Sequence, residues 1–255
     1  MMFLFSFGSL FAKTKPKFLV CYGKFDIVKV KGYDLLIVEA AHFKYSDIQF
    51  LKKYNKKVVA YISLGEVNES AKDFKFLKET TSGKNNDWNS HYLDLTAEKT
   101  IVVLKKRIKN IFFMGYDGLF LDNIDNFTSF GPTFNQQHNL IQFIKEIRGI
   151  YLDKFLVQNA GLEIVNKTEE FIDCVLIESI VTGYDFNEKK YQLRSEAEIK
   201  QRLDVINQQF YNSKIPVLLL EYANKTKLKR EVSKILKRTK YSFSINEITL
   251  QKIPD

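Results

Sequence analysis

The chain has 255 residues, of which 45% are hydrophobic, and carries a net charge of +9. This length and composition allow a sizeable core and exclude a mostly disordered chain. The charge does not indicate a nucleic-acid partner, because eight Lys or Arg and one Glu lie between residues 225 and 240, and the remainder is close to neutral. No low-complexity run or proline-rich linker divides the chain, so we expect a single domain.

The N-terminus, MMFLFSFGSLFAKTKPKF, is an apolar run followed by lysines. The run is too short to span a membrane. It resembles the apolar centre of a secretory signal, although the basic residues that normally precede such a centre are lacking. We therefore assign residues 1–16 to a signal peptide or to an apolar N-terminal segment packed against the fold, and residues 17–255 to the folded domain. The first alternative predicts a secreted or periplasmic protein without stable membrane insertion after processing, and the second a cytoplasmic one.

Short apolar runs alternate with longer amphipathic segments along the rest of the chain. The runs are rich in Val, Ile, Leu and Phe, as expected for parallel strands buried on both faces. They cover residues 18–23, 34–40, 57–66, 118–123, 154–161, 174–179, 216–223 and 241–245. Between them, apolar residues recur at helical spacing in residues 101–111, 140–147, 199–210 and 228–236.

Eight strands alternating with helices favour a single (β/α)₈ TIM barrel, of the α/β class. An open doubly wound sheet is the alternative, but no glycine-rich turn follows the first strand to hold a dinucleotide. A further short strand is expected at residues 91–95, within the long loop after the third barrel strand. The basic segment, residues 225–240, is interpreted as an outer helix with a solvated face, and attraction to an anionic membrane or polymer is the alternative.

The sequence does not indicate a metal or cofactor site. Cys21 and Cys174 lie inside apolar runs, so we interpret them as core residues. The three histidines, His42, His91 and His138, have no ligand-like spacing. An oxygen-liganded Mg²⁺ or Ca²⁺ stays open as an alternative.

Polar side chains recur where the predicted strands end. Active sites of such barrels are built from the C-terminal ends of the strands. The residues placed there are Glu39, Glu66, Asp122, Asn159, Glu178 and Glu221. A ring of acids with few cations suits either metal-assisted chemistry or glycoside hydrolysis, in which two carboxyl groups flank one bond.

Aromatic residues lie in or just after the same strand ends and could form platforms for sugar rings. They are Tyr22, Tyr61, Trp88, Tyr184 and Tyr222. Ordinary core packing is the alternative for each of them individually.

Six motifs in this order resemble one known family, the endo-α-1,4-polygalactosaminidases of glycoside hydrolase family 114. They are CYG, YISLGE, GYDGLFLDNID, QNAGLEI, LIESIVTGYDF and LLLEYA. The resemblance implies a (β/α)₈ barrel and hydrolysis of α-1,4-linked galactosamine-containing polysaccharide. It also implies a retaining mechanism with Asp122 as nucleophile and Glu178 as general acid/base, although the two roles could be exchanged.

The resemblance further implies a set of substrate-binding residues: Tyr22, Tyr61, Glu66, Asn159, Tyr184, Glu221 and Tyr222. Glu221 departs from the family, which often has aspartate there, and its longer side chain is expected to reach further into the cleft. Glu66 and Glu221 could instead support other site residues through hydrogen bonds.

The sequence therefore predicts a monomeric glycoside hydrolase with a polysaccharide substrate and no cofactor. A barrel that binds carbohydrate without turnover is the alternative function.

Overall fold

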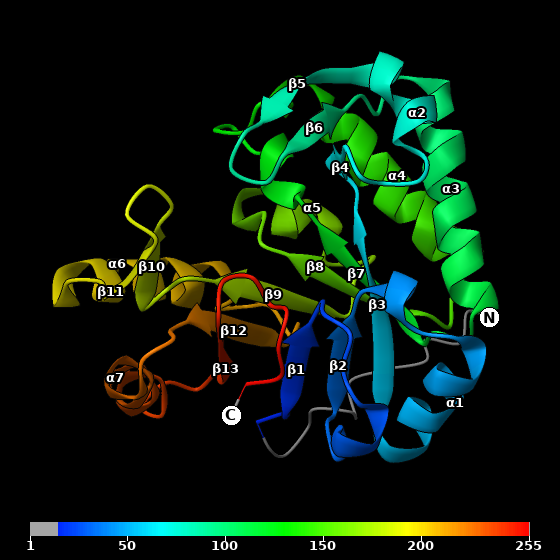
Figure 1. Cartoon of the computed structure of the whole chain (residues 1–255). Helices are drawn as coiled ribbons and strands as arrows, with labels where there is room; N and C mark the ends of the chain where they lie inside the picture. The colour runs from blue at the N-terminus through cyan, green and yellow to red at the C-terminus, as the bar shows by residue number, and fades with distance from the viewer. Residues whose placement is uncertain (1–14, 255) are drawn as a thin grey trace.

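The computed structural model describes residues 15–254, so residues 1–14 of the predicted N-terminal segment lie outside the described residues. Eight parallel strands form one sheet in the order β1-β2-β3-β7-β8-β9-β12-β13, curved into a barrel (Figure 1). The strands are β1 (Phe18–Cys21), β2 (Leu35–Val38), β3 (Lys57–Ser63), β7 (Gly118–Asp122), β8 (Phe155–Asn159), β9 (Cys174–Glu178), β12 (Val217–Tyr222) and β13 (Ser242–Asn246). All eight predicted strands and the (β/α)₈ fold are confirmed.

The first and last strands meet at a seam, where the side-chain amide of Asn246 donates to the backbone oxygen of Val20 over 3.0 Å.

Helices cover the outside of the barrel. They are α1 (Tyr45–Tyr54), α2 (Phe74–Leu77), α3 (Glu98–Phe113), α4 (Gln137–Ile150), α5 (Val165–Thr168), α6 (Glu196–Gln209) and α7 (Thr226–Leu236). In α3, for example, Leu104, Ile108 and Ile111 are buried on one face, at the spacing that the sequence shows. None of the helices in residues 15–254 is long and apolar enough to cross a membrane.

Short 3₁₀ turns complete the connections. They are η2 (Ile27–Lys29), η3 (Ala40–His42), η4 (Lys78–Thr80), η5 (Ile124–Phe127), η6 (Phe134–Gln136) and η7 (Leu162–Ile164).

The basic segment forms α7, on the outside of the barrel (Figure 1). Val232 and Leu236 are buried on its inner face, while its Lys and Arg side chains occupy the rest of the surface. The predicted outer helix is confirmed.

Two inserted segments, called the first and second excursions, extend from the barrel at the C-terminal end of its parallel strands. The first follows β3 and forms an antiparallel sheet of β4 (Glu66–Asn68), β6 (Ser90–Leu93) and β5 (Thr81–Asn85). Its strand β6 confirms the extra strand expected at residues 91–95. The second follows β9 and is a hairpin of β10 (Thr182–Asp185) and β11 (Lys190–Leu193).

The core divides into two clusters because successive strand residues point to opposite faces. One cluster fills the barrel interior with alternate residues of the strands, such as Phe120, Val157 and Leu176. The other packs the outward residues between strands and helices. Cys21 and Cys174 are both buried and free.

Gly118 allows β7 and β8 to approach closely, because a Cβ atom at this position would lie 1.8 Å from the backbone oxygen of Phe155. We expect Gly118→Ala to lower the free energy of unfolding by about 3 kcal/mol, as the strands must separate. Gly149→Ala is the matched control. It lies in α4 with no atom within 4 Å of the added Cβ, and helix propensity favours Ala by up to about 1 kcal/mol. Urea unfolding of both variants measures the difference, and an equal stability for both would contradict this role of Gly118.

Candidate active site

Three polar side chains meet at the C-terminal ends of three neighbouring strands. Asp122 ends β7, Asn159 ends β8 and Glu178 ends β9. The Asn159 side-chain nitrogen donates to Asp122 Oδ1 over 2.7 Å and to Glu178 Oε1 over 2.9 Å. The two carboxylate oxygens can therefore be no more than about 5.6 Å apart, the distance at which the nitrogen would lie on the line between them.

Strand alternation directs these three side chains into the barrel, since Phe120, Val157 and Leu176 lie two residues before them in the interior cluster. The residue that follows each of them has a left-handed backbone conformation. These residues are Asn123 (φ 60°), Ala160 (φ 54°) and Ser179 (φ 59°). A non-glycine residue in this region costs on the order of 1 kcal/mol, and such strain clusters at functional sites. Each strand thus turns sharply away just after presenting its polar side chain.

Tyrosines contact both acids from inside the barrel. The Tyr222 hydroxyl donates to Glu178 Oε2, and Tyr61 hydrogen-bonds Asp122. Tyr22 packs on Tyr61 with ring centroids 4.7 Å apart. Burial, followed by the negative charge of the nearby acids, keeps the pKa of all three phenols well above the usual range. The three hydroxyls therefore stay protonated, and those of Tyr61 and Tyr222 serve as neutral donors to the acids.

Burial is also the main influence on the pKa values of the two acids. It raises the pKa of Glu178 to about 7, with a further increase from the charge of Asp122, while the donors Tyr222 and Asn159 oppose the shift. Burial also raises the pKa of Asp122, against hydrogen bonds from Asn159, the Asn123 backbone and Tyr61. The site therefore favours one proton on Glu178 near neutral pH, with Asp122 held by three donors that stabilise its charged form.

Glu66 does not end β3, as the sequence suggested, since β3 finishes at Ser63 and Glu66 begins β4. Its side chain is 4% exposed and accepts hydrogen bonds from Asn126 over 3.0 Å, from Asn85 over 3.2 Å and from Ser90. Glu66 thus joins the first excursion to the loop after β7 through hydrogen bonds. This agrees with the alternative role for Glu66, in which it supports other residues through hydrogen bonds.

Ser63 was missed as a supporting residue by the sequence reasoning. Its hydroxyl donates to the Asn123 side chain over 2.6 Å and accepts from the Glu66 backbone over 2.8 Å. It therefore stabilises the strained turn directly after Asp122.

Glu221 is turned away from the cleft, contrary to the expected reach into it. Leu218, Leu220 and Tyr222 point into the barrel, so alternation turns Glu221 outward. It is fully buried, and its two oxygens accept four hydrogen bonds of 2.8–2.9 Å from Ile180 N, Val181 N, Thr182 N and Thr182 Oγ1.

Glu221 therefore anchors the segment that links Glu178 to the second excursion. Burial raises its pKa, and the four donors oppose the increase.

Glu39 and Tyr184 are not in contact with the acid pair. Glu39 follows β2 and caps η3 by accepting from Ala41 N over 3.1 Å. Tyr184 lies in β10, where its ring centroid is 4.8 Å from that of Tyr191 and 5.0 Å from that of Phe186.

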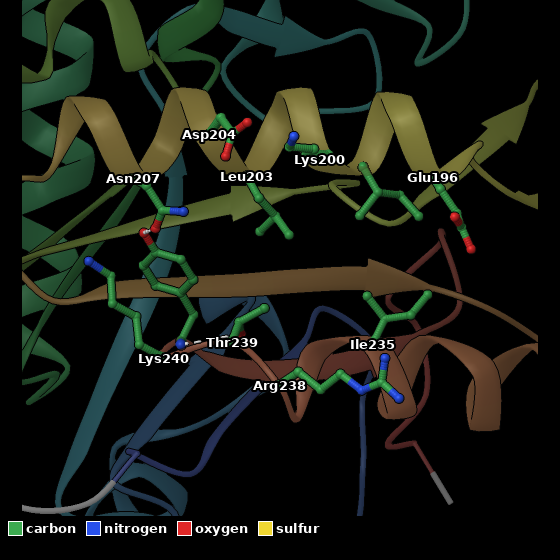
Figure 2. A pocket seen from close by; sticks show the side chains of 11 residues that line it. Glu196, Lys200, Leu203, Asp204, Asn207, Ile235, Arg238, Thr239 and Lys240 are labelled. Carbon is green, nitrogen blue, oxygen red and sulfur yellow. Dashed lines mark hydrogen bonds between the residues drawn. The ribbon is translucent and has the colours of Figure 1, made fainter.

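A separate hollow of about 560 Å³ lies outside the barrel between α6 and α7 (Figure 2). Tyr241 spans it by donating to Asn207 Oδ1 over 2.7 Å. Side chains of both charges line this hollow. It lies among helices, away from the C-terminal ends of the strands, so it is not the candidate active site. Within residues 15–254, no group of three or more His, Cys, Asp or Glu is arranged to hold a metal ion.

Comparison with known proteins identifies the family of the chain. The model of glycoside hydrolase family GH114 matches residues 11–253 of the chain. The chain belongs to family GH114. The predicted family and the predicted class of enzyme, a glycoside hydrolase, are thereby confirmed.

Several solved structures share the barrel. The GH114 chain is similar to the glycoside hydrolase domain of PelA from Pseudomonas aeruginosa, with 23% identity, a TM-score of 0.83 and coverage of 94% of this chain and 97% of that chain. It is similar to Aspergillus fumigatus Ega3, solved with galactosamine, with 15% identity, a TM-score of 0.74 and 94% coverage of both. A family GH13_31 enzyme matches with 13% identity and a TM-score of 0.58, over 86% of this chain and 59% of that chain. A search of the curated proteins gave no match.

We expect Glu221→Ala to lower the free energy of unfolding by about 3–5 kcal/mol, because it leaves buried donors of the segment 180–182 without an acceptor. Glu221→Gln keeps one acceptor oxygen and should lose about half as much. Urea denaturation followed by circular dichroism measures both. A Glu221→Ala variant as stable as the wild type would show that the carboxylate does not anchor this segment.

Proposed function

We propose that this GH114 hydrolase cleaves α-1,4-linked galactosamine-containing polysaccharide through Asp122 and Glu178. The observation that carries the proposal is the single amide of Asn159 that bridges two partly buried carboxylates inside the barrel mouth. Such a pair, with an acid of raised pKa beside one held by several donors, matches the requirement for an acid and a nucleophile at one glycosidic bond.

The short distance between the carboxylates supports a retaining mechanism. Retaining glycosidases have carboxyl groups about 5–5.5 Å apart, whereas inverting enzymes separate them by about 6.5–9.5 Å to admit a water molecule. The limit of about 5.6 Å between Asp122 Oδ1 and Glu178 Oε1 fits the first class.

The environments of the two acids support distinct roles. Asp122 attacks the anomeric carbon while Glu178 gives its proton to the departing glycosidic oxygen, so that a glycosyl ester forms on Asp122. Glu178 then removes a proton from water as the water attacks the anomeric carbon, and Asp122 leaves as the carboxylate. Tyr222 and Asn159 hold the Glu178 carboxylate, each by donating to one of its two oxygens.

The acidic character of the cleft supports an amine-bearing sugar as substrate. Ega3, which shares the barrel, was solved with galactosamine. Ammonium groups on deacetylated units would be attracted to the carboxylates of this cleft, regardless of the basic helix α7 on the outer surface. An extracellular or periplasmic polymer also agrees with residues 1–16 acting as a signal peptide, and we propose a monomer that acts there.

A direct test measures reducing-end release from partially deacetylated α-1,4-linked galactosamine polymer. We expect Asp122→Asn and Glu178→Gln each to reduce the rate by about 10²–10⁴-fold, since each removes a group that acts in the transition state. Asp153→Asn, with a side chain 79% exposed just before β8, is the control and should keep wild-type activity.

Binding to the same polymer separates the alternatives. Binding without release by the wild type would favour a barrel that has lost turnover. Neither binding nor release would overturn the proposed substrate.

The pH profile tests the assignment of the acid. Activity should fall as pH rises through about 7, because Glu178 then loses the proton that it must donate. Tyr222→Phe removes a hydrogen bond that favours the charged form, so the pKa of Glu178 rises and the alkaline limb of the kcat/KM profile moves to higher pH. An alkaline limb that stays in place or moves to lower pH in Tyr222→Phe would assign it to another group.

A further inference from the structure

Two turns that are distant in sequence meet at the end of the barrel that holds the acids. Trp88 lies in the turn between β5 and β6 of the first excursion, and Phe186 lies in the turn between β10 and β11 of the second. Their ring centroids are 5.5 Å apart and their planes are inclined at 81°. Neither residue has a part in the acid pair or its supporting hydrogen bonds.

The position of this contact follows from the strand order. The excursions start after β3 and β9, and the strands between these two in the sheet are β7 and β8. The contact between Trp88 and Phe186 therefore spans the part of the barrel rim above the strands that end in Asp122 and Asn159. Figure 1 shows both excursions extending beyond the barrel strands.

A continuous series of aromatic rings connects this contact with the interior. Phe186 meets Tyr184 edge to face, with centroids 5.0 Å apart, and Tyr184 meets Tyr191 at 4.8 Å. Tyr191 packs against the interior cluster, as Tyr61 also does. Aromatic rings thus extend from the outer turns to the interior cluster.

Both turns are held by hydrogen bonds although their rings are exposed. Asn68 Nδ2 donates to the Trp88 backbone oxygen over 2.9 Å. Asp185 Oδ1 accepts from Asn187 N and Glu188 N, each over 2.9 Å. Trp88 remains 48% exposed and Phe186 38% exposed.

An indole and a phenyl ring on two hydrogen-bonded turns, both still partly open to solvent, present apolar surface suited to the C–H face of a pyranose ring.

We propose that Trp88 and Phe186 form a distal subsite that stacks on a pyranose unit of the polymer, away from the bond that is cleaved. This subsite rests on the proposed function, since it serves the same cleft and the same polymer. It makes binding depend on chain length, because short oligosaccharides that occupy only the acid pair do not reach the two rings. Loss of the Trp88 side chain then selectively weakens the binding of long chains.

The test measures KM and kcat for a series of α-1,4-linked galactosamine oligosaccharides of increasing length and for the polymer. The variants are Trp88→Ala, Phe186→Ala and Trp88→Phe. Tyr211→Ala serves as control, because Tyr211 is an 82% exposed aromatic residue just after α6, at the opposite end of the barrel. Thermal unfolding of each variant reports any loss of structure in the excursions.

In the wild type we expect KM to fall sharply at the length that first reaches the rings. In Trp88→Ala this step should disappear, so that the ratio of polymer KM to shortest-substrate KM rises about tenfold, with kcat nearly constant. Trp88→Phe should restore part of the step, and Tyr211→Ala should keep all of it.

If the fall in KM with chain length persists in Trp88→Ala and Phe186→Ala, the distal subsite is overturned. An equal rise in KM at every length would also overturn it. Both outcomes leave the proposed function intact. Absence of both cleavage and binding of the polymer by the wild type would overturn both.

Discussion

The site depends on one side-chain amide that holds two partly buried carboxylates together. Two acids this close repel each other, and burial makes their charged forms still less favourable. The Asn159 nitrogen lowers this cost by donating to both, 2.7 Å from Asp122 and 2.9 Å from Glu178. The remaining neighbours make the pair uneven, because Asp122 also accepts from the Asn123 backbone and Tyr61, while the charge of Asp122 helps to raise the pKa of Glu178 to about 7. Asn159 thus keeps the acids close, and their other neighbours make their environments different.

The turns that follow the acids, and the residues that hold these turns, maintain this arrangement. Left-handed residues such as Asn123 and Ser179 turn the chain away just after the acids, and hydrogen bonds hold these turns in place. Ser63 contacts the turn after Asp122, and Glu221 anchors the segment after Glu178 with four hydrogen bonds. Buried carboxylates with complete sets of donors therefore serve the barrel as structural groups beside the pair that we assign to catalysis.

The charge of the chain is divided in space in a way that agrees with the cationic substrate that we propose. Much of the net charge of +9 lies in residues 225–240, and the helix α7 within it covers the outer layer of the barrel. The acids instead gather inside the barrel mouth, where low-polarity walls concentrate their field. A polymer bearing ammonium groups is attracted by this local field, so the overall charge is a poor guide to the ligand.

Continuous apolar runs that alternate with segments of helical periodicity were sufficient to predict the barrel, because strands buried on both faces must be apolar almost throughout. They also placed Asp122, Asn159 and Glu178 at strand ends, and alternation along each strand was enough to direct them inward. The same alternation would have turned Glu221 outward, had it been applied to Leu218, Leu220 and Tyr222. The bridge through Asn159, the hydrogen bonds of Glu66 and the contact between Trp88 and Phe186 join residues 19 to 98 positions apart. Such contacts depend on how the loops close over the barrel, which no local periodicity records, so tertiary structure alone established them.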